Sequence, residues 1–167
     1  MRLVILEGPD GAGKTTLAQA LQMDFGMDYT HEGPPPADRD VLAYYFGRLV
    51  EAARRAPIIL DRFALGERVY GPIIRGLDGV GEQGWLEMNA VLESLNAVQV
   101  VCLPPFEQCH AAWHERAGVK AEMILHEAVF KASYERWLWA ATLPNQVLYD
   151  WTQPTSYDAI AALVARR

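Results

Sequence analysis

The stretch that decides the fold is Gly8-Pro9-Asp10-Gly11-Ala12-Gly13-Lys14-Thr15, followed by Thr16. It fits the phosphate-loop pattern G-x-x-x-x-G-K-[ST] at every fixed position. The residues before it, 3–6, form an apolar run of the kind found in buried parallel strands. Apolar residues after it are spaced for one face of a helix, at Leu17, Ala20, Leu21 and Phe25. The motif therefore lies in the strand, loop and helix context that a nucleotide-binding loop requires.

Each part of this loop can hold phosphate. Glycines let successive backbone N–H groups close around phosphate oxygens, and the N-terminus of the following helix favours negative charge. Lys14 can reach the β- and γ-phosphates, and the Thr15 hydroxyl can ligate Mg²⁺. We therefore expect residues 8–16 to bind ATP together with Mg²⁺.

Composition limits the class of protein. A chain of 167 residues fits one domain, and 51% hydrophobic with 22% charged residues is typical of a globular protein and excludes a disordered one. No apolar run is long enough to span a membrane, and the first strand leaves no room for a signal peptide. Two cysteines, Cys102 and Cys109, are too few for a disulfide framework, so we expect a cytoplasmic protein. The net charge of −6 argues against general attraction to nucleic acid.

The rest of the chain alternates between strand and helix patterns. Further strands are predicted at 27–31, 57–61, 98–103 and 146–149, and helices from about 38, over 66–75 and 81–96, and from 107, 121 and 155. The pattern predicts an α/β fold with three layers, in which a five-stranded parallel sheet has helices on both faces. Ligands of such folds bind beyond the carboxyl ends of the strands, where the glycine loop and Asp61 both lie.

Asp61 ends the apolar strand 57–61, which is the position of an acid that orients hydrated Mg²⁺ beside the phosphates. Arg62 and Phe63 follow it, and residues 66–77 carry Tyr70 and the run Arg75-Gly76-Leu77. A bidentate arginine suits phosphoryl transfer, in which charge spreads over several oxygens.

These segments resemble the thymidylate kinase family, which pairs an acid-containing glycine loop with an Asp-Arg-aromatic strand end and a later Arg-Gly-Leu. The resemblance implies that Asp10 meets the acceptor sugar, Arg62 the acceptor phosphate and Arg75 the acceptor side of the cleft. Tyr70 would pack near the sugar or base, and Arg62 with Phe63 would help to hold the second substrate.

The chain departs from that family in two places. The region 30–36 reads Thr-His-Glu-Gly-Pro-Pro-Pro and lacks the arginine that the family carries there. The helix that contains Phe46 and Arg48 is short, and Phe46 can either stack on a base or pack in the core. A compact chain of this kind also resembles phage-encoded kinases, including those that phosphorylate 5-hydroxymethyluracil within DNA.

We expect a small lid at 114–122. Arg116 and Lys120 can close over the triphosphate there, and Arg116 would then be a catalytic residue. A plain turn between two helices explains the same residues equally well.

Cys109, His110 and His114 suggest zinc, and the two histidines share a helix face. However, Cys102 lies within a strand and the chain lacks a C-x-x-C pair, so we expect surface histidines instead. The tryptophans are expected mainly in the core, with Trp113 or Trp139 as an alternative stacking platform for nucleic acid.

Taken with the resemblance, the sequence predicts a kinase that transfers the γ-phosphoryl group of ATP to a thymidylate-like pyrimidine deoxynucleotide. Lys14 and Arg62 would stabilise transition-state charge, while Thr15 and Asp61 would hold Mg²⁺. The first alternative is the same transfer to 5-hydroxymethyluracil in DNA, and the second is a regulatory nucleotide-binding ATPase with no acceptor. A homodimer is a further expectation, as is a location in the host cytoplasm if a phage encodes the chain.

Overall fold

The computed structural model describes residues 2–117 and 127–166. In this part of the chain, five strands form one parallel sheet with the order β2-β3-β1-β4-β5. The strands are β1 (Leu3–Glu7), β2 (Asp28–His31), β3 (Ile58–Asp61), β4 (Val98–Cys102) and β5 (Gln146–Tyr149). The helices are α1 (Lys14–Phe25), α2 (Val41–Arg55), α3 (Ala64–Ile74), α4 (Gly81–Ser94), α5 (Phe106–Ala117), α6 (Glu127–Ala140) and α7 (Ser156–Ala165).

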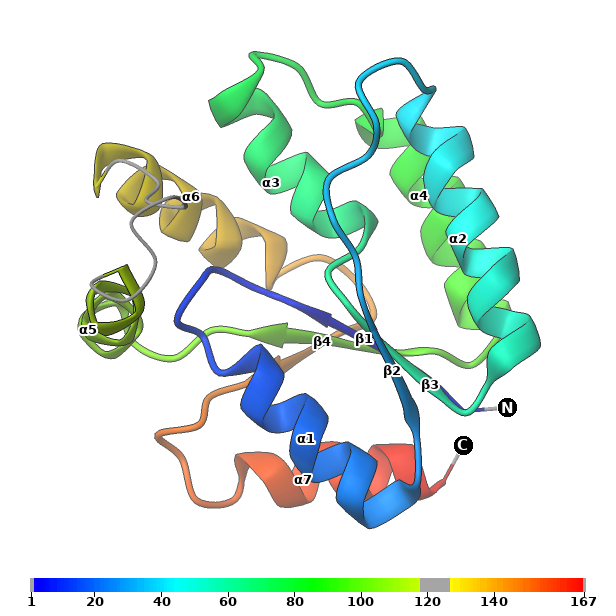
Figure 1. The fold of residues 1–167 in the computed structure, drawn as a ribbon, viewed down its shortest axis with the longest axis vertical. Helices are drawn as coiled ribbons and strands as arrows, with labels where there is room; N and C mark the ends of the chain where they lie inside the picture. The colour runs from blue at the N-terminus through cyan, green and yellow to red at the C-terminus, as the bar shows by residue number, and fades with distance from the viewer. Residues whose placement is uncertain (1, 118–126, 167) are drawn as a thin grey trace.

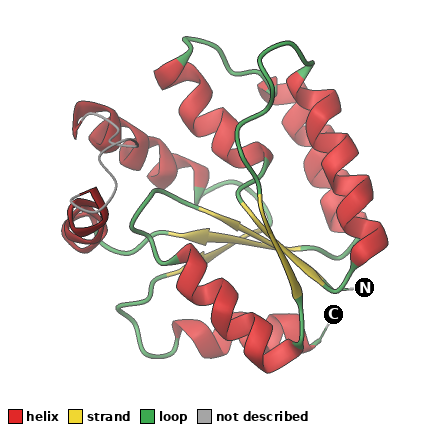
Figure 2. Ribbon diagram, viewed as in Figure 1, coloured by secondary structure: helices red, strands yellow, loops and turns green. Residues whose placement is uncertain are grey.

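The helices cover both faces of the sheet (Figures 1 and 2). Helices α1 and α7 contact each other and lie on one face, whereas α2, α3 and α4 lie on the other. Helix α6 packs against α3, and α5 lies beside the loop that joins β1 to α1 (Figure 1). The α/β fold with three layers is therefore confirmed.

Three strands are fully buried because their side chains are covered on both faces, which explains their continuous apolar sequence. They are β1, β3 and β4, and β1 lies between the other two. The register places Asp61 opposite Leu6 on one side and opposite His31 on the other. The ends of β1, β2 and β3 therefore meet at one edge of the sheet, and this edge carries the candidate site.

Several element boundaries differ from the predicted ones. Helix α2 begins at Val41 rather than near Asp38, because the Asp40 carboxylate accepts a hydrogen bond of 2.7 Å from the Ala43 N–H and caps the helix there. Helix α3 begins two residues earlier than predicted, directly after Phe63. Helix α7 begins without a side-chain cap: Thr155 makes no side-chain capping bond, and the Ser156 hydroxyl accepts from the Asp150 N–H.

The tryptophans divide between core and surface. Trp85, Trp113 and Trp137 are buried, as expected. Trp139 and Trp151 are 38% and 42% exposed, so three of the five tryptophans lie in the core, where most of them were expected. Within the described ranges, no helix combines the length and apolar character that crossing a membrane would require.

Candidate active site

The loop after β1 has the backbone that phosphate binding requires. Gly8, Gly11 and Gly13 have φ angles of 138°, 82° and 84°, in a backbone region that residues other than glycine rarely adopt. Gly13 is the N-cap of α1, so the first N–H groups of that helix face the same space as the loop. The buried Lys14 Nζ donates hydrogen bonds to the carbonyls of Gly8 (2.8 Å) and Pro9 (2.7 Å), which holds the ammonium inside the loop.

The three glycines also allow three neighbouring segments to approach closely. A Cβ at Gly8 would lie 2.2 Å from the carbonyl oxygen of Cys102, at the end of β4. A Cβ at Gly11 would lie 2.4 Å from the carbonyl oxygen of Cys109, on α5. A Cβ at Gly13 would lie 2.9 Å from the Trp151 ring, in the segment after β5. The loop is therefore fixed from three sides.

Asp61 is buried beside this loop and is held by two side chains of β2. Its Oδ2 accepts a hydrogen bond of 2.7 Å from the Tyr29 hydroxyl and lies 3.3 Å from His31 Nδ1. Burial and the neighbouring Asp61 raise the pKa of Tyr29 to about 12, so this phenol stays neutral and can donate. Neither Tyr29 nor His31 was assigned to the site from the sequence.

The residues predicted to hold Mg²⁺ fit that ion. The Thr15 side chain lies near enough to the Tyr29 phenol to lower its pKa in part, so this phenol is close to both Thr15 and Asp61. The other oxygen of Asp61, Oδ1, is buried and has no hydrogen-bond partner among the described residues. A hydroxyl and a carboxylate oxygen are suitable ligands for Mg²⁺, which also keeps several of its waters.

Arg62 has an unusual backbone for a residue that is not glycine, with a φ angle of 77°. Such a conformation costs about 1–3 kcal/mol and persists only where surrounding contacts impose it. Here the Arg62 N–H donates to the Leu6 carbonyl (2.8 Å), and its Nη2 donates to Asp10 Oδ1 (2.6 Å). The guanidinium is therefore held next to the glycine loop, as predicted for a residue that contacts transferred or accepting phosphate.

Glu7 is a residue of this site that the sequence reading missed. Its carboxylate lies at the end of β1 and accepts a hydrogen bond of 3.1 Å from the Gly66 N–H. Burial raises the pKa of Glu7 to about 7, although Lys14 and Arg62 lower it in part. The feature of the sequence that could have indicated Glu7 is a single acidic residue at the end of an apolar strand. The carboxyl group of Glu7 therefore titrates near neutral pH, next to the cations of the phosphate site.

The residues predicted for the acceptor side do not all have exposed side chains. Tyr70 accepts a hydrogen bond from Trp137 Nε1 (3.4 Å), and Arg75 pairs with the buried Glu67. Phe46 packs against the core, and Phe63 is buried with its ring at an edge-to-face angle to another aromatic ring. Phe63 therefore supports the site from within the core, Phe46 is partly buried against the core, and Tyr70 and Arg75 lie on α3 and at its end.

A cluster of cations and aromatic rings joins α3, α4 and α6 next to this region. The buried Arg68 pairs with Asp78 and Glu82, and its guanidinium lies 5.2 Å from the Trp139 ring. Arg136 donates to the Arg68 carbonyl (2.7 Å) and lies 5.6 Å from the same ring. Trp139 therefore lies close to two arginines, which the sequence spacing alone did not indicate.

Arg116 lies on the last turn of α5, where its side chain is exposed and makes no ion pair with the described residues. The predicted lid at 114–122 lies partly outside those residues, and Lys120 lies wholly outside them. The catalytic role of Arg116 stays a prediction.

Comparisons with known proteins identify the fold. No protein-family model matches the chain, and no curated protein matches its sequence. The YorR protein of Bacillus subtilis, solved with phosphorylated GDP, is 19% identical with a TM-score of 0.71 over 98% of this chain and 95% of its own. A deoxyadenosine kinase from M. mycoides with bound dCTP is 14% identical, with a TM-score of 0.63 over 99% and 100%. A gluconokinase from Sinorhizobium meliloti is 16% identical, with a TM-score of 0.61 over 99% and 92%. The chain thus has the fold of P-loop kinases.

Proposed function

We propose that this chain is a kinase that transfers the γ-phosphoryl group of ATP in a reaction that depends on Mg²⁺. The observation that carries this proposal is the meeting of the glycine loop and Lys14 with the Asp61–Arg62 strand end, at one edge of the sheet. Phosphoryl transfer uses these parts: a loop that holds the phosphates, a cation, an acidic residue that holds the metal ion, and a second cation. The fold shared with two solved kinases supports the same conclusion.

The residues act by position and charge. Lys14 exchanges its two carbonyl partners for phosphate oxygens, and the N–H groups at the start of α1 bind the same phosphates. Thr15 and Asp61 Oδ1 hold Mg²⁺, which neutralises charge on the phosphates when it is bound. Arg62, which pairs with Asp10 of the glycine loop, stabilises charge that develops on the transferred group.

For the acceptor we propose a thymidylate-like pyrimidine deoxynucleotide. The Asp10–Arg62 pair offers a carboxylate for a sugar hydroxyl and a guanidinium for a phosphate, close to the loop that binds ATP. Tyr70 and Arg75 lie on and at the end of the helix that follows Arg62. The structural neighbours include a deoxyadenosine kinase solved with dCTP and with the product dCMP, which supports an acceptor that contains a deoxyribose.

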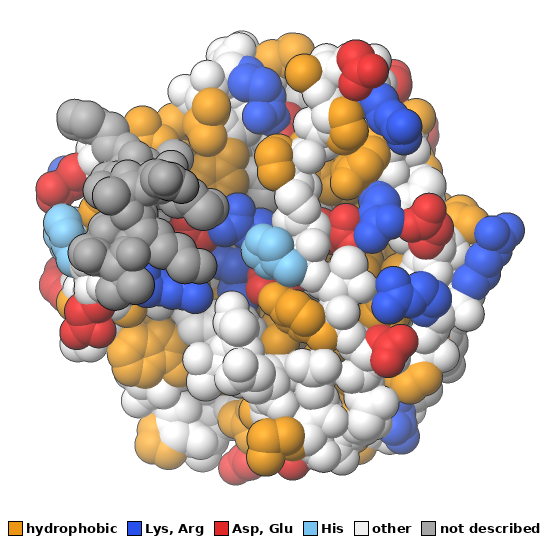
Figure 3. Space-filling model, viewed as in Figure 1, with side chains coloured by type: hydrophobic (Ala, Val, Ile, Leu, Met, Phe, Trp, Pro, Cys, Tyr) orange, Lys and Arg blue, Asp and Glu red, His pale blue; other side chains and the backbone are white. Residues whose placement is uncertain are grey.

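A second candidate acceptor is 5-hydroxymethyluracil within DNA. One observation favours it, because Trp139 is 38% exposed and lies close to two arginines, and such aromatic surfaces stack on bases. Two observations weigh against it. The net charge is −6, and Figure 3 shows basic side chains interspersed with acidic ones on the visible face rather than in a continuous band.

One experiment tests these proposals together. Labelled ATP is offered with each deoxynucleoside, each deoxynucleoside monophosphate and single- and double-stranded DNA that contains 5-hydroxymethyluracil. We expect transfer to pyrimidine monophosphates, and none with Lys14→Ala. Transfer to DNA alone, falling steeply with added salt, would replace the first acceptor by the second. ATP hydrolysis without transfer to any acceptor would indicate a regulatory ATPase and contradict the kinase.

A further inference from the structure

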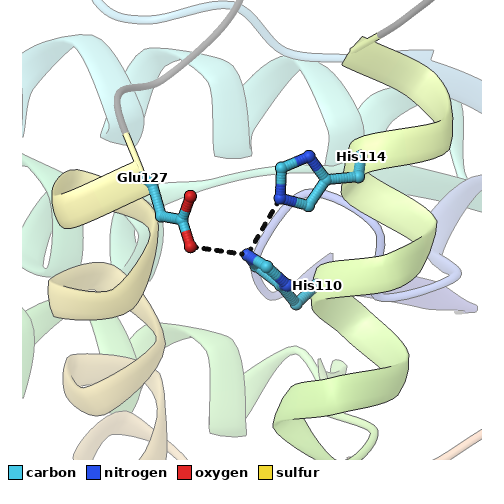
Figure 4. Close-up of side chains that lie close together, drawn as sticks. All are labelled: His110, His114 and Glu127. Atoms are coloured by element: carbon cyan, nitrogen blue, oxygen red, sulfur yellow. Dashed lines mark hydrogen bonds and ion pairs between the residues drawn. The ribbon is translucent and has the colours of Figure 1, made fainter.

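Three side chains with metal-binding atoms meet between α5 and the start of α6 (Figure 4). His110 and His114 are one helical turn apart on α5, and Glu127 is the first residue of α6. His110 Nε2 lies 3.1 Å from His114 Nε2 and 3.2 Å from Glu127 Oε1, and the three ligand atoms all lie within 4.8 Å of one another. Two separate helices therefore direct two imidazoles and a carboxylate at one point.

We propose that His110, His114 and Glu127 form a binding site for Zn²⁺. Ligand atoms at zinc distances of 2.0–2.2 Å in a tetrahedral site are separated by about 3.3–3.5 Å from one another. The two close separations are 3.1 and 3.2 Å, so an ion between these atoms needs only small movements of exposed side chains. Two nitrogens and one carboxylate oxygen favour Zn²⁺ over Mg²⁺ and Ca²⁺, which prefer oxygen ligands alone.

The rings that surround these histidines hold them in place. Phe106 stacks on His110 with ring centroids 5.3 Å apart and an angle of 17° between the planes. Trp113 contacts both histidines, at 5.8 Å from His110 and 4.7 Å from His114. Because Trp113 is itself buried, one face of the cluster is fixed to the core, and a water would complete the four ligands of a tetrahedral site.

The thiol beside the cluster takes no part in it. Cys109 points toward the glycine loop, where its Sγ donates to the Asp10 carbonyl at 3.3 Å. The ligand set therefore contains imidazole and carboxylate without sulfur, unlike the cysteine-based combination that the sequence suggested.

Zinc at this site would join α5 to α6 without touching the reacting groups. The other side of α5 supports the glycine loop, since Gly11 lies against the backbone of Cys109 and Trp113. A bound ion would therefore stabilise the helix on which that loop rests. It would raise the melting temperature, because ligands that bind only the folded state stabilise it.

Calorimetric titration of the full chain with zinc chloride, after treatment with EDTA and dialysis, tests the proposal. We expect one zinc per chain, affinity at least about tenfold lower in each of His110→Ala, His114→Ala and Glu127→Gln, and a rise in Tm with zinc that these variants lack. Glu115→Gln removes an exposed carboxylate of α5 outside the cluster and serves as the matched control, with unchanged binding. Bound Co²⁺ should show the visible bands of tetrahedral coordination without a thiolate charge-transfer band.

Three results would overturn the inference. They are the absence of stoichiometric zinc binding, binding that all three variants retain, and a thiolate charge-transfer band with Co²⁺. Glu127 is 65% exposed, so Glu127→Gln should fold normally and keeps the test decisive even if a histidine variant is unstable. None of these outcomes depends on the acceptor, so zinc binding and kinase activity can fail independently.

Discussion

Glu7 allows a quantitative test of the site, because its burial has an energetic consequence that depends on pH. Burial raises the pKa of Glu7 from 4.5 to about 7, which corresponds to about 3 kcal/mol of differential interaction between its two protonation states. The substitution Glu7→Gln replaces the carboxyl by an uncharged group of the same shape. The amide oxygen can still accept the hydrogen bond from the Gly66 N–H.

The direction of this pH dependence follows from whether the folded or the unfolded protein binds the proton of Glu7 more tightly. Because the folded protein holds the proton of Glu7 more tightly than the unfolded chain, this group favours folding below pH 4.5 and loses that contribution as the pH rises through 7. Glu7→Gln should therefore leave the free energy of unfolding almost unchanged at pH 4.5. It should raise that free energy at pH 8, by at most about 3 kcal/mol.

Urea unfolding at several pH values between 4.5 and 8 measures this difference directly. Glu135→Gln, an exposed carboxylate of α6, is the control and should show no such dependence. If Glu7→Gln is less stable than the parent at pH 8, the charged carboxylate stabilises the folded state through Lys14 and Arg62, and the assignment of burial as the dominant effect is refuted.

Five further predictions concern the phosphate site. Lys14→Ala should lower turnover by at least about 100-fold, since it removes a cation at developing charge, and retention of a third of the activity would refute the role. Asp61→Asn should abolish transfer that depends on Mg²⁺, while the circular dichroism spectrum stays unchanged. Tyr29→Phe removes one hydrogen bond of about 1 kcal/mol and should therefore weaken the apparent Mg²⁺ affinity about fivefold. Arg62→Ala and Arg62→Gly should both lower kcat/KM for the acceptor by about 30–150-fold, with little change in kcat/KM for ATP. If kcat/KM for the acceptor recovers in the glycine variant alone, the loss in the alanine variant comes from the backbone conformation and not from the guanidinium. Gly11→Ala should lower the free energy of unfolding by about 1–3 kcal/mol, and a thermal melt equal to the parent's would contradict the close contact with α5.

The parts of the site that the sequence predicted are those coded by neighbouring residues. The glycine loop and Lys14 are local in the chain, and Asp61 is recognisable because it ends an apolar strand. Parallel strands alternating with helices then require both to lie at the same edge of the sheet, so their proximity also followed from the sequence.

The other parts depend on contacts between distant segments. Tyr29 reaches Asp61 across 32 residues, because β2 and β3 are adjacent in a register that no local pattern specifies. The partners of Arg62 and Arg75 are likewise set by packing rather than by spacing. Phe46 illustrates the limit, since its aromatic side chain suits both a stacking surface and a core, and the folded chain places it partly buried against the core.

The three glycines of the phosphate loop have a consequence for protein engineering. Each lies against a different segment, namely the end of β4, the middle of α5 and the residues after β5. Transplanting residues 8–16 into another scaffold would therefore transfer the sequence motif without the walls that shape it. A functional graft would have to include those three segments, and homologues of this chain should accept changes there only in coordinated sets.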